Sequence, residues 1–212
     1  MYKRFYRRRL PHLQTLGSTL FVTFRLAGSI PDAVVRQLIA ETERMEAGLC
    51  RLADPHERDR QLSLERRRLF GKWDAALDTA TGGPFWLRDS QVAGIVSESM
   101  HHLDGKVYQL DAYCVMPNHV HLVCAPLSKE GGVYYGMPGI MHSLKRHAAR
   151  QANVILGRQG EFWQHESYDH VIRDEEEWRR VIAYVLNNPV KAGLVQLAEE
   201  WKWNYYRPVG QI

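Results

Sequence analysis

The chain has 212 residues, of which 45% are hydrophobic and 25% are charged. This composition is typical of a folded globular protein and excludes extended disorder. No apolar stretch approaches the roughly 18 residues that a membrane span needs, and no hydrophobic signal core follows the basic first ten residues. Three cysteines without a CxxC motif favour a reduced, cytoplasmic protein, and the length favours one domain over residues 1–212.

The net charge of +4 is a weak indication of a polyanionic partner, but its distribution says more than its total. Five cations interleaved with aromatic residues stand among the first ten residues: Lys3, Arg4, Arg7, Arg8 and Arg9. Basic groups attract phosphates, and aromatic rings offer stacking faces to unpaired bases. Arg4, Arg7 and Arg8 are therefore candidate contacts to nucleic acid, with a solvated leader of no function as the alternative.

The first predicted strand covers residues 18–26 (STLFVTFRL), where β-branched and aromatic residues alternate along the chain. A long helical stretch follows over about 29–104, with helices predicted at 30–48, 53–80 and 89–103. The middle helix is dense in charge, as a solvated helical face is, although its run of arginines can also reach a phosphate backbone. The run comprises Arg66, Arg67 and Arg68.

Two further strands are predicted at 107–116 and 119–125. They are joined through Pro117-Asn118, and so short a connection predicts an antiparallel hairpin. Residues 140–156 then predict a basic amphipathic helix. Its Lys145 and Arg146 are candidate contacts to DNA phosphates, and a plain solvated face is the alternative.

An extended segment is predicted over 162–172, and Asp174 is expected to cap a last helix that Pro189 stops. Residues from about 196 to 212 form an aromatic and basic tail. The order β-α(αα)-β-β-α-β-α predicts the α+β class: a ferredoxin-like antiparallel sheet with helices packed on it and a helical insertion after the first strand.

His119 and His121 stand two residues apart in a predicted strand, so their side chains leave the same face of the sheet. Two neutral imidazoles on one face make half of a site for a divalent cation. The motif is short, and a pair of surface or cross-strand histidines remains the alternative interpretation.

The last helix adds two candidates. Its apolar stripe consists of Trp178, Val181, Ile182, Val185 and Leu186. Tyr184 lies off that stripe, and Asn188 follows four residues later on the same face. The pattern therefore presents a hydroxyl and an amide carbonyl together, away from the core, near a helix end that favours a cation. A surface tyrosine and an asparagine that only ends the helix are the alternatives.

Together these segments resemble a known family. YCVMPNHVHLV (113–123), FWQHESYDHVIRD (162–174) and YVLNNPVKAGLV (184–195) are similar to the single-tyrosine HUH transposases of the IS200 type and, more closely, to the REP-associated tyrosine transposases. The resemblance implies the HUH single-tyrosine fold, with Tyr184 as nucleophile and His119 and His121 as metal ligands. Asn188 falls at the position of the third ligand, which in much of the IS200 group is a glutamine.

The resemblance also implies an activity: a metal-dependent transposase that cleaves and rejoins single-stranded DNA at hairpin-associated sites through a 5′-phosphotyrosine intermediate. Two nitrogen ligands and one amide oxygen suit Mg²⁺ or Mn²⁺. The expected partner is single-stranded DNA with a hairpin of the REP palindrome kind. No membrane partner is expected, and both a monomer and a homodimer fit the sequence.

Two functions of other classes remain open. One is a catalytically inactive ferredoxin-like module that only binds nucleic acid. The other is a metal-dependent hydrolase that attacks with water and leaves Tyr184 without a role. A covalent complex between protein and DNA distinguishes the transposase from both, because neither alternative forms one.

Overall fold

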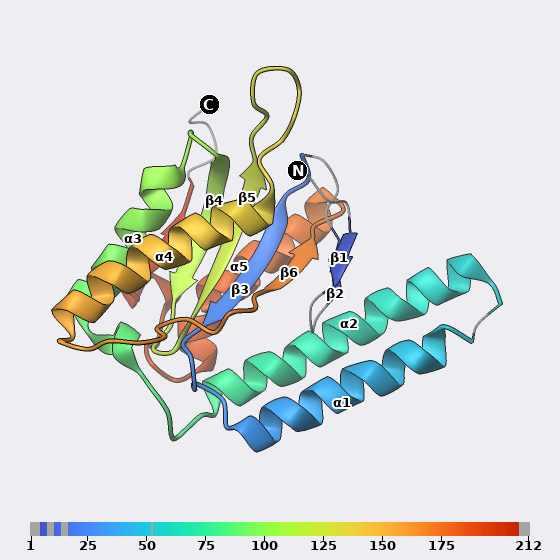
Figure 1. Ribbon diagram of the computed structural model, residues 1–212, viewed down its shortest axis with the longest axis horizontal. Helices are drawn as coiled ribbons and strands as arrows, with labels where there is room; N and C mark the ends of the chain where they lie inside the picture. Colours follow the sequence, from blue (N-terminus) through green and yellow to red (C-terminus); the bar gives the residue numbers. More distant parts are fainter. Residues whose placement is uncertain (1–4, 8–10, 14–16, 52, 208–212) are drawn as a thin grey trace. The chain divides into compact units, whose positions relative to one another are not determined.

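The computed structural model describes residues 5–7, 11–13, 17–51 and 53–207 (Figure 1). The chain divides into two compact units. Residues 28–84 form one, which we call the helical unit. The described residues of 1–27 and 85–212 form the other, which we call the sheet unit and which contains His119, His121, Tyr184 and Asn188.

The sheet unit is built on a five-stranded antiparallel sheet with the strand order β6-β3-β5-β4-β7. The strands are β3 (Leu20–Arg25), β4 (Tyr108–Val115), β5 (His119–Pro126), β6 (Tyr168–Val171) and β7 (Asn204–Tyr206). Four of these strands, β6-β3-β5-β4, have the spatial order of a ferredoxin-like βαββαβ fold, and α3 and α4 connect them as that fold requires. This arrangement confirms the predicted class. The hairpin of β4 and β5 is confirmed as well.

Three helices cover the two faces of this sheet (Figure 1). They are α3 (Ser90–Leu103), α4 (Met137–Ile155) and α5 (Glu175–Lys191). The packed α3 and α4 cover one face, and their apolar residues form the main hydrophobic core with Val22, Phe24 and Leu122. The other face lies against α5 and carries the polar residues that alternate with this core along the strands.

The helical unit consists of α1 (Asp32–Leu49) and α2 (Pro55–Asp78), which pack against each other. Glu41 of α1 accepts hydrogen bonds from Arg68 and Lys72 of α2. Residues 28–84 contain nine Lys and Arg against ten Asp and Glu. The positive excess of the chain therefore lies outside this unit. Of the segment predicted as inserted (29–104), α1 and α2 belong to the helical unit and α3 to the sheet unit.

Short elements complete the described part of the chain. They are a hairpin of β1 (Phe5–Arg7) and β2 (Pro11–Leu13), and two 3₁₀ turns at Trp86–Arg88 and Ala198–Glu200. No helix in the described part of the chain combines the length and the apolar character that crossing a lipid bilayer requires.

Two predictions about element ends are wrong. Pro189 does not stop the last helix, since α5 continues to Lys191. A proline so close to a helix end removes one hydrogen bond of the final turn, and the backbone N–H of Ala192 still donates to the Asn188 carbonyl at 2.9 Å. The predicted tail also contains a strand: residues of β7 pair with β4 at the edge of the sheet.

Candidate metal and nucleophile site

One side chain caps the start of α5, and two others hold the helix on the sheet. Asp174 caps the helix by accepting a hydrogen bond from the Glu177 backbone N–H at 2.7 Å. The Trp178 indole N–H donates to the Asp111 carboxylate at 3.0 Å, across to β4. Near the other end, Asn204 of β7 donates to the Leu186 carbonyl at 2.9 Å. Both ends of α5 are therefore held against the sheet.

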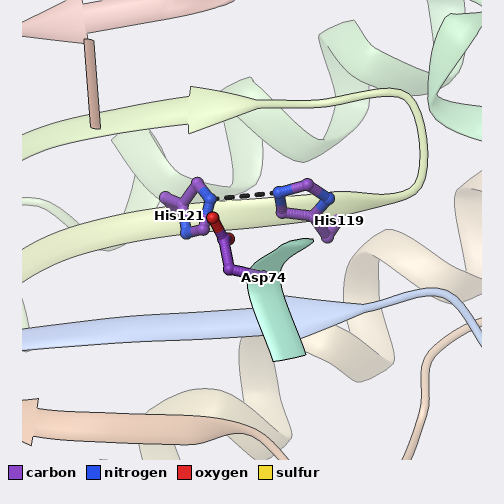
Figure 2. A group of neighbouring side chains, drawn as sticks. All are labelled: Asp74, His119 and His121. Carbon is purple, nitrogen blue, oxygen red and sulfur yellow. Dashed lines mark hydrogen bonds between the residues drawn. The ribbon is translucent and has the colours of Figure 1, made fainter. Parts of the chain in front are cut away.

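His119 and His121 lie on β5, on the face that α5 covers. Both side chains are fully buried, with 0% of their surface exposed. Their Nε2 atoms face each other at 3.0 Å, as the dashed line in Figure 2 shows. The predicted shared face is therefore confirmed, and the pair is a buried cluster instead of two surface histidines.

The other ring nitrogen of each histidine has its own partner. The Asn118 side-chain oxygen lies 2.7 Å from His119 Nδ1, and the Thr23 hydroxyl lies 2.8 Å from His121 Nδ1. An amide oxygen only accepts hydrogen bonds, so this contact favours the His119 tautomer with the proton on Nδ1 and a lone pair on Nε2. Metal-binding histidines are commonly oriented in this way by a partner on the second nitrogen.

Asn188 joins this cluster from α5. Its side chain is fully buried, and Nδ2 lies 3.1 Å from His121 Nε2. Its oxygen Oδ1 is buried and accepts no hydrogen bond from any residue that the structure describes. Rotation of the amide group by half a turn about its Cβ–Cγ bond exchanges the positions of Nδ2 and Oδ1. The oxygen then faces the histidine nitrogens. With its oxygen turned toward the imidazoles, Asn188 would complete a set of three neighbouring ligand atoms of the kind that a divalent cation binds.

The buried position of Asn188 corrects the sequence interpretation, which directed this residue away from the core. The face of α5 against the sheet includes Glu177 and Asn188 beside Ile182 and Val185. The pattern of apolar residues on α5 does not identify this buried face correctly, because the sheet surface that it contacts is polar where the histidines lie.

Asp74, the third residue labelled in Figure 2, belongs to α2 of the helical unit. The three candidate ligands His119, His121 and Asn188 all belong to the sheet unit.

Tyr184 lies one helical turn before Asn188 and is half-buried. Its ring centroid is 5.6 Å from that of His121 and 6.0 Å from that of Phe21 on β3. The Lys191 ammonium lies 5.6 Å from the centre of the tyrosine ring. A phenol, two imidazoles, an amide and a cation are thus gathered at one place by α5 and β5.

The candidate DNA contacts lie elsewhere or outside the description. Arg4 and Arg8 are outside the described residues, and Arg7 is described only as a backbone position in β1. Arg146 is exposed on α4, on the face of the sheet opposite the histidines. Lys145 donates to the backbone carbonyls of the segment after α4, at 3.0 Å for the nearest.

The two residues that contact the Nδ1 atoms of the histidines were not singled out from the sequence, and neither was Lys191. Asn118 immediately precedes the first histidine, and this adjacency was an available signal. Thr23 lies on β3 opposite His121 in the strand register, 98 positions away in the sequence. Only the pairing of β3 with β5 reveals its contact.

Comparisons with known proteins agree with the resemblance. No family model matches the chain. A REP-associated tyrosine transposase of Escherichia coli K12 is 26% identical over 130 residues, covering 58% of this chain and 73% of that protein. A protein of Haemophilus influenzae described as a putative REP-associated tyrosine transposase is 22% identical over 104 residues, covering 47% of this chain. That match spans 59% of the Haemophilus protein, less than two thirds of its length.

Among solved structures, a REP-associated tyrosine transposase bound to a REP hairpin has a similar fold. The TM-score is 0.50 at 18% sequence identity, and the match covers 94% of this chain and 80% of that one. The similarity supports the ferredoxin-like arrangement described above.

Proposed function

We propose that this chain, a distant relative of the REP-associated tyrosine transposases, cleaves and rejoins single-stranded DNA beside a hairpin, with Tyr184 as nucleophile. The observation that carries the proposal is the convergence of Tyr184, His119, His121 and Asn188 on one face of the sheet. One copy of the chain supplies all four side chains.

The reaction exchanges one phosphate ester for another. The Tyr184 oxygen attacks the scissile phosphorus and loses its proton, while the bond to the departing 3′ oxygen breaks and that oxygen gains a proton. The products are a 5′-phosphotyrosine and a free 3′-OH. The ester conserves the energy of the broken bond, so rejoining needs no nucleotide cofactor.

Each residue has a defined task in this scheme. His119, His121 and Asn188 would hold Mg²⁺ or Mn²⁺, and the bound ion would supply Lewis-acid stabilisation of the negative charge that develops on the phosphate. Asn118 and Thr23 fix the orientation of the imidazoles. Lys191 places a positive charge beside the ring of Tyr184, where it can offset the negative charge of the phosphate that the tyrosine attacks.

The proposal is tested with an end-labelled oligonucleotide that contains a hairpin, in the presence of Mn²⁺. We expect a covalent complex that survives a denaturing gel, its loss in Tyr184→Phe, and its retention in the matched control Tyr168→Phe. Hairpin binding without any covalent complex supports the binding module instead. Cleavage that leaves a free 5′-phosphate without an adduct supports the water-using hydrolase.

A further inference from the structure

Phe21 lies on β3, an interior strand that pairs with β5 on one side and with β6 on the other. Side chains alternate along a strand, so Phe21 shares the face of Thr23, whose hydroxyl contacts His121. Val22 and Phe24 belong to the core on the opposite face. Only 4% of the Phe21 surface is exposed. A large apolar ring is therefore enclosed on the face that carries the polar groups of the site.

The Phe21 ring packs against three aromatic rings that come from three other elements. Its centroid lies 5.5 Å from that of His121 on β5, with an angle of 29° between the ring planes. The Tyr184 ring of α5 lies 6.0 Å away at 85°, and the Tyr168 ring of β6 lies 6.4 Å away at 69°. These are the separations and angles of favourable stacked and edge-to-face pairs. Phe21 thus joins a candidate metal ligand to the proposed nucleophile.

The orientation of the Tyr184 ring is not fixed by α5 alone. The helix sets the direction of the Cα–Cβ bond, but a half-buried tyrosine can still occupy more than one side-chain rotamer. A nucleophile must lie close to the phosphorus and in line with the departing oxygen, and a misplacement of about 1 Å can cost on the order of 100-fold in rate. A ring that packs against Tyr184 removes orientations from which the phenol oxygen cannot attack.

The surroundings of Phe21 hold its own ring in place. His121, on which it stacks, is contacted by the Thr23 hydroxyl at 2.8 Å and by the Asn188 amide at 3.1 Å. Tyr168, on the other side, lies opposite Thr23 in the register of β6 against β3. Functional side chains are placed most precisely when the groups that support them are themselves fixed by packing and by secondary structure.

We propose that Phe21 is a positioning residue for strand cleavage, whose ring holds the Tyr184 phenol in the orientation from which its oxygen attacks the phosphate. The inference rests on the proposed function, because that function makes Tyr184 the nucleophile. Phe21 has no group that reacts or binds a metal, so it acts through Tyr184. Loss of its ring should therefore slow the chemical step and leave the binding of DNA and of Mn²⁺ unchanged.

The test compares the same substitution on the two faces of one strand. Phe21→Leu removes the ring beside Tyr184. The matched control Phe24→Leu removes a buried ring of the core, which packs 4.9 Å from Trp163 and has 1% of its surface exposed. Both variants should have lower melting temperatures than the wild type, since both lose a buried aromatic side chain. Only the first should alter the chemistry.

The cleavage rate is measured in a single turnover, at saturating DNA and Mn²⁺ and well below the melting temperature of each variant. For Phe21→Leu we expect a rate about tenfold or more below that of the wild type. Its Mn²⁺ midpoint and its affinity for the hairpin should remain those of the wild type. For Phe24→Leu the rate, the midpoint and the affinity should all be unchanged.

A second readout reports the orientation of the nucleophile without any cleavage. With 3,5-difluorotyrosine in place of Tyr184, the wild type and Phe24→Leu should give the narrow ¹⁹F NMR signals of a fixed ring. In Phe21→Leu the signals should broaden or multiply, as they do for a ring with several orientations. If Phe21→Leu does not fold, Tyr168→Leu replaces it, because this variant loosens Phe21 from a half-buried position at the sheet edge. It should show both effects to a smaller extent.

Three results overturn the inference while the wild-type covalent complex at Tyr184 still forms, and the proposed function then stands. The first is an unchanged cleavage rate or unchanged ¹⁹F signals in Phe21→Leu or its replacement. The second is an equal loss of rate in Phe24→Leu, which makes the effect one of general packing. The third is a loss that saturating Mn²⁺ restores, which places the effect on His121. If the wild type forms no complex at Tyr184, the proposed function fails and the inference fails with it.

Discussion

The Asn188 side-chain nitrogen lies 3.1 Å from His121 Nε2, although the two residues are 67 positions apart in the sequence. The contact joins the last turn of α5 to the centre of the sheet. It brings the asparagine, with an oxygen that accepts no hydrogen bond from the described residues, beside a pair of imidazoles. The candidate metal ligands and the tyrosine one turn earlier are thereby brought together by α5 and β5.

The first prediction concerns Asn188 as a metal ligand. Asn188→Ala should raise the Mn²⁺ concentration for half-maximal cleavage about tenfold or more, because one of three protein ligands is lost. Asn188→Gln should restore part of the affinity, since it returns a carbonyl oxygen. The measurement is a Mn²⁺ titration of cleavage, with DNA binding and a melting curve recorded for each variant.

The alternative role of Asn188, as a residue that only completes the helix end, predicts a different outcome. Both substitutions should then lower the melting temperature by a similar small amount. The Mn²⁺ midpoint should remain that of the wild type. Such a pair of results would return Asn188 to a structural role.

The second prediction concerns the histidines. His119→Ala and His121→Ala should each abolish cleavage in both Mg²⁺ and Mn²⁺, because two ligands on one strand cannot replace each other. Hairpin binding should persist in both variants. An excess of chelator should stop the wild-type enzyme, and full activity in chelator would contradict metal dependence.

The third prediction concerns the orienting partners of the histidines. Asn118→Ala removes the acceptor for His119 Nδ1–H and should weaken metal affinity by about 10- to 100-fold. Thr23→Val should act in the same direction through His121. The two effects should appear in the Mn²⁺ midpoint, and saturating Mn²⁺ should restore most of the cleavage rate. Unchanged midpoints would mean that neither contact orients a ligand.

The fourth prediction concerns pH and the junction of β6 with α5. Burial alone would raise the pKa of Glu177, but hydrogen bonds from His170 and from the Arg173 backbone N–H outweigh it and lower that pKa below its ordinary value of 4.5. A lowered carboxyl pKa adds stability above 4.5, and this stability is lost as the pH falls further. The melting temperature of the wild type should therefore fall more steeply below pH 4.5 than that of Glu177→Gln. Parallel curves would contradict this role of Glu177.

Much of the fold follows from local patterns. Alternation along residues 18–26 and the short joint at Pro117-Asn118 predict β3 and the hairpin of β4 and β5, and both are present. The strand β7 was not predicted, because three residues carry little periodicity and their pairing with β4 is a long-range contact. The geometry of β5 also predicts the shared face of His119 and His121, since a strand alternates its side chains.

The surroundings of the histidines depend on tertiary structure. The contact of Thr23 with His121 requires the register of β3 against β5. To predict the burial of Asn188, one must know that α5 packs on the polar face of the sheet. The hydrophobic periodicity of α5 does not reveal this. The end of α5 could not be predicted from the sequence either. A proline predicts that the helix ends there, but the remaining hydrogen bonds of the last turn extend α5 to Lys191.

In the proposed reaction, Tyr184 forms the covalent bond to DNA. The most direct measurement is mass spectrometry of the complex formed with a hairpin oligonucleotide in Mn²⁺, after digestion of protein and DNA. The account predicts one modified peptide, with a nucleotide 5′-phosphate attached to the Tyr184 oxygen. A modification on Tyr168 instead, or cleaved DNA with a free 5′-phosphate and no modified peptide, would contradict it.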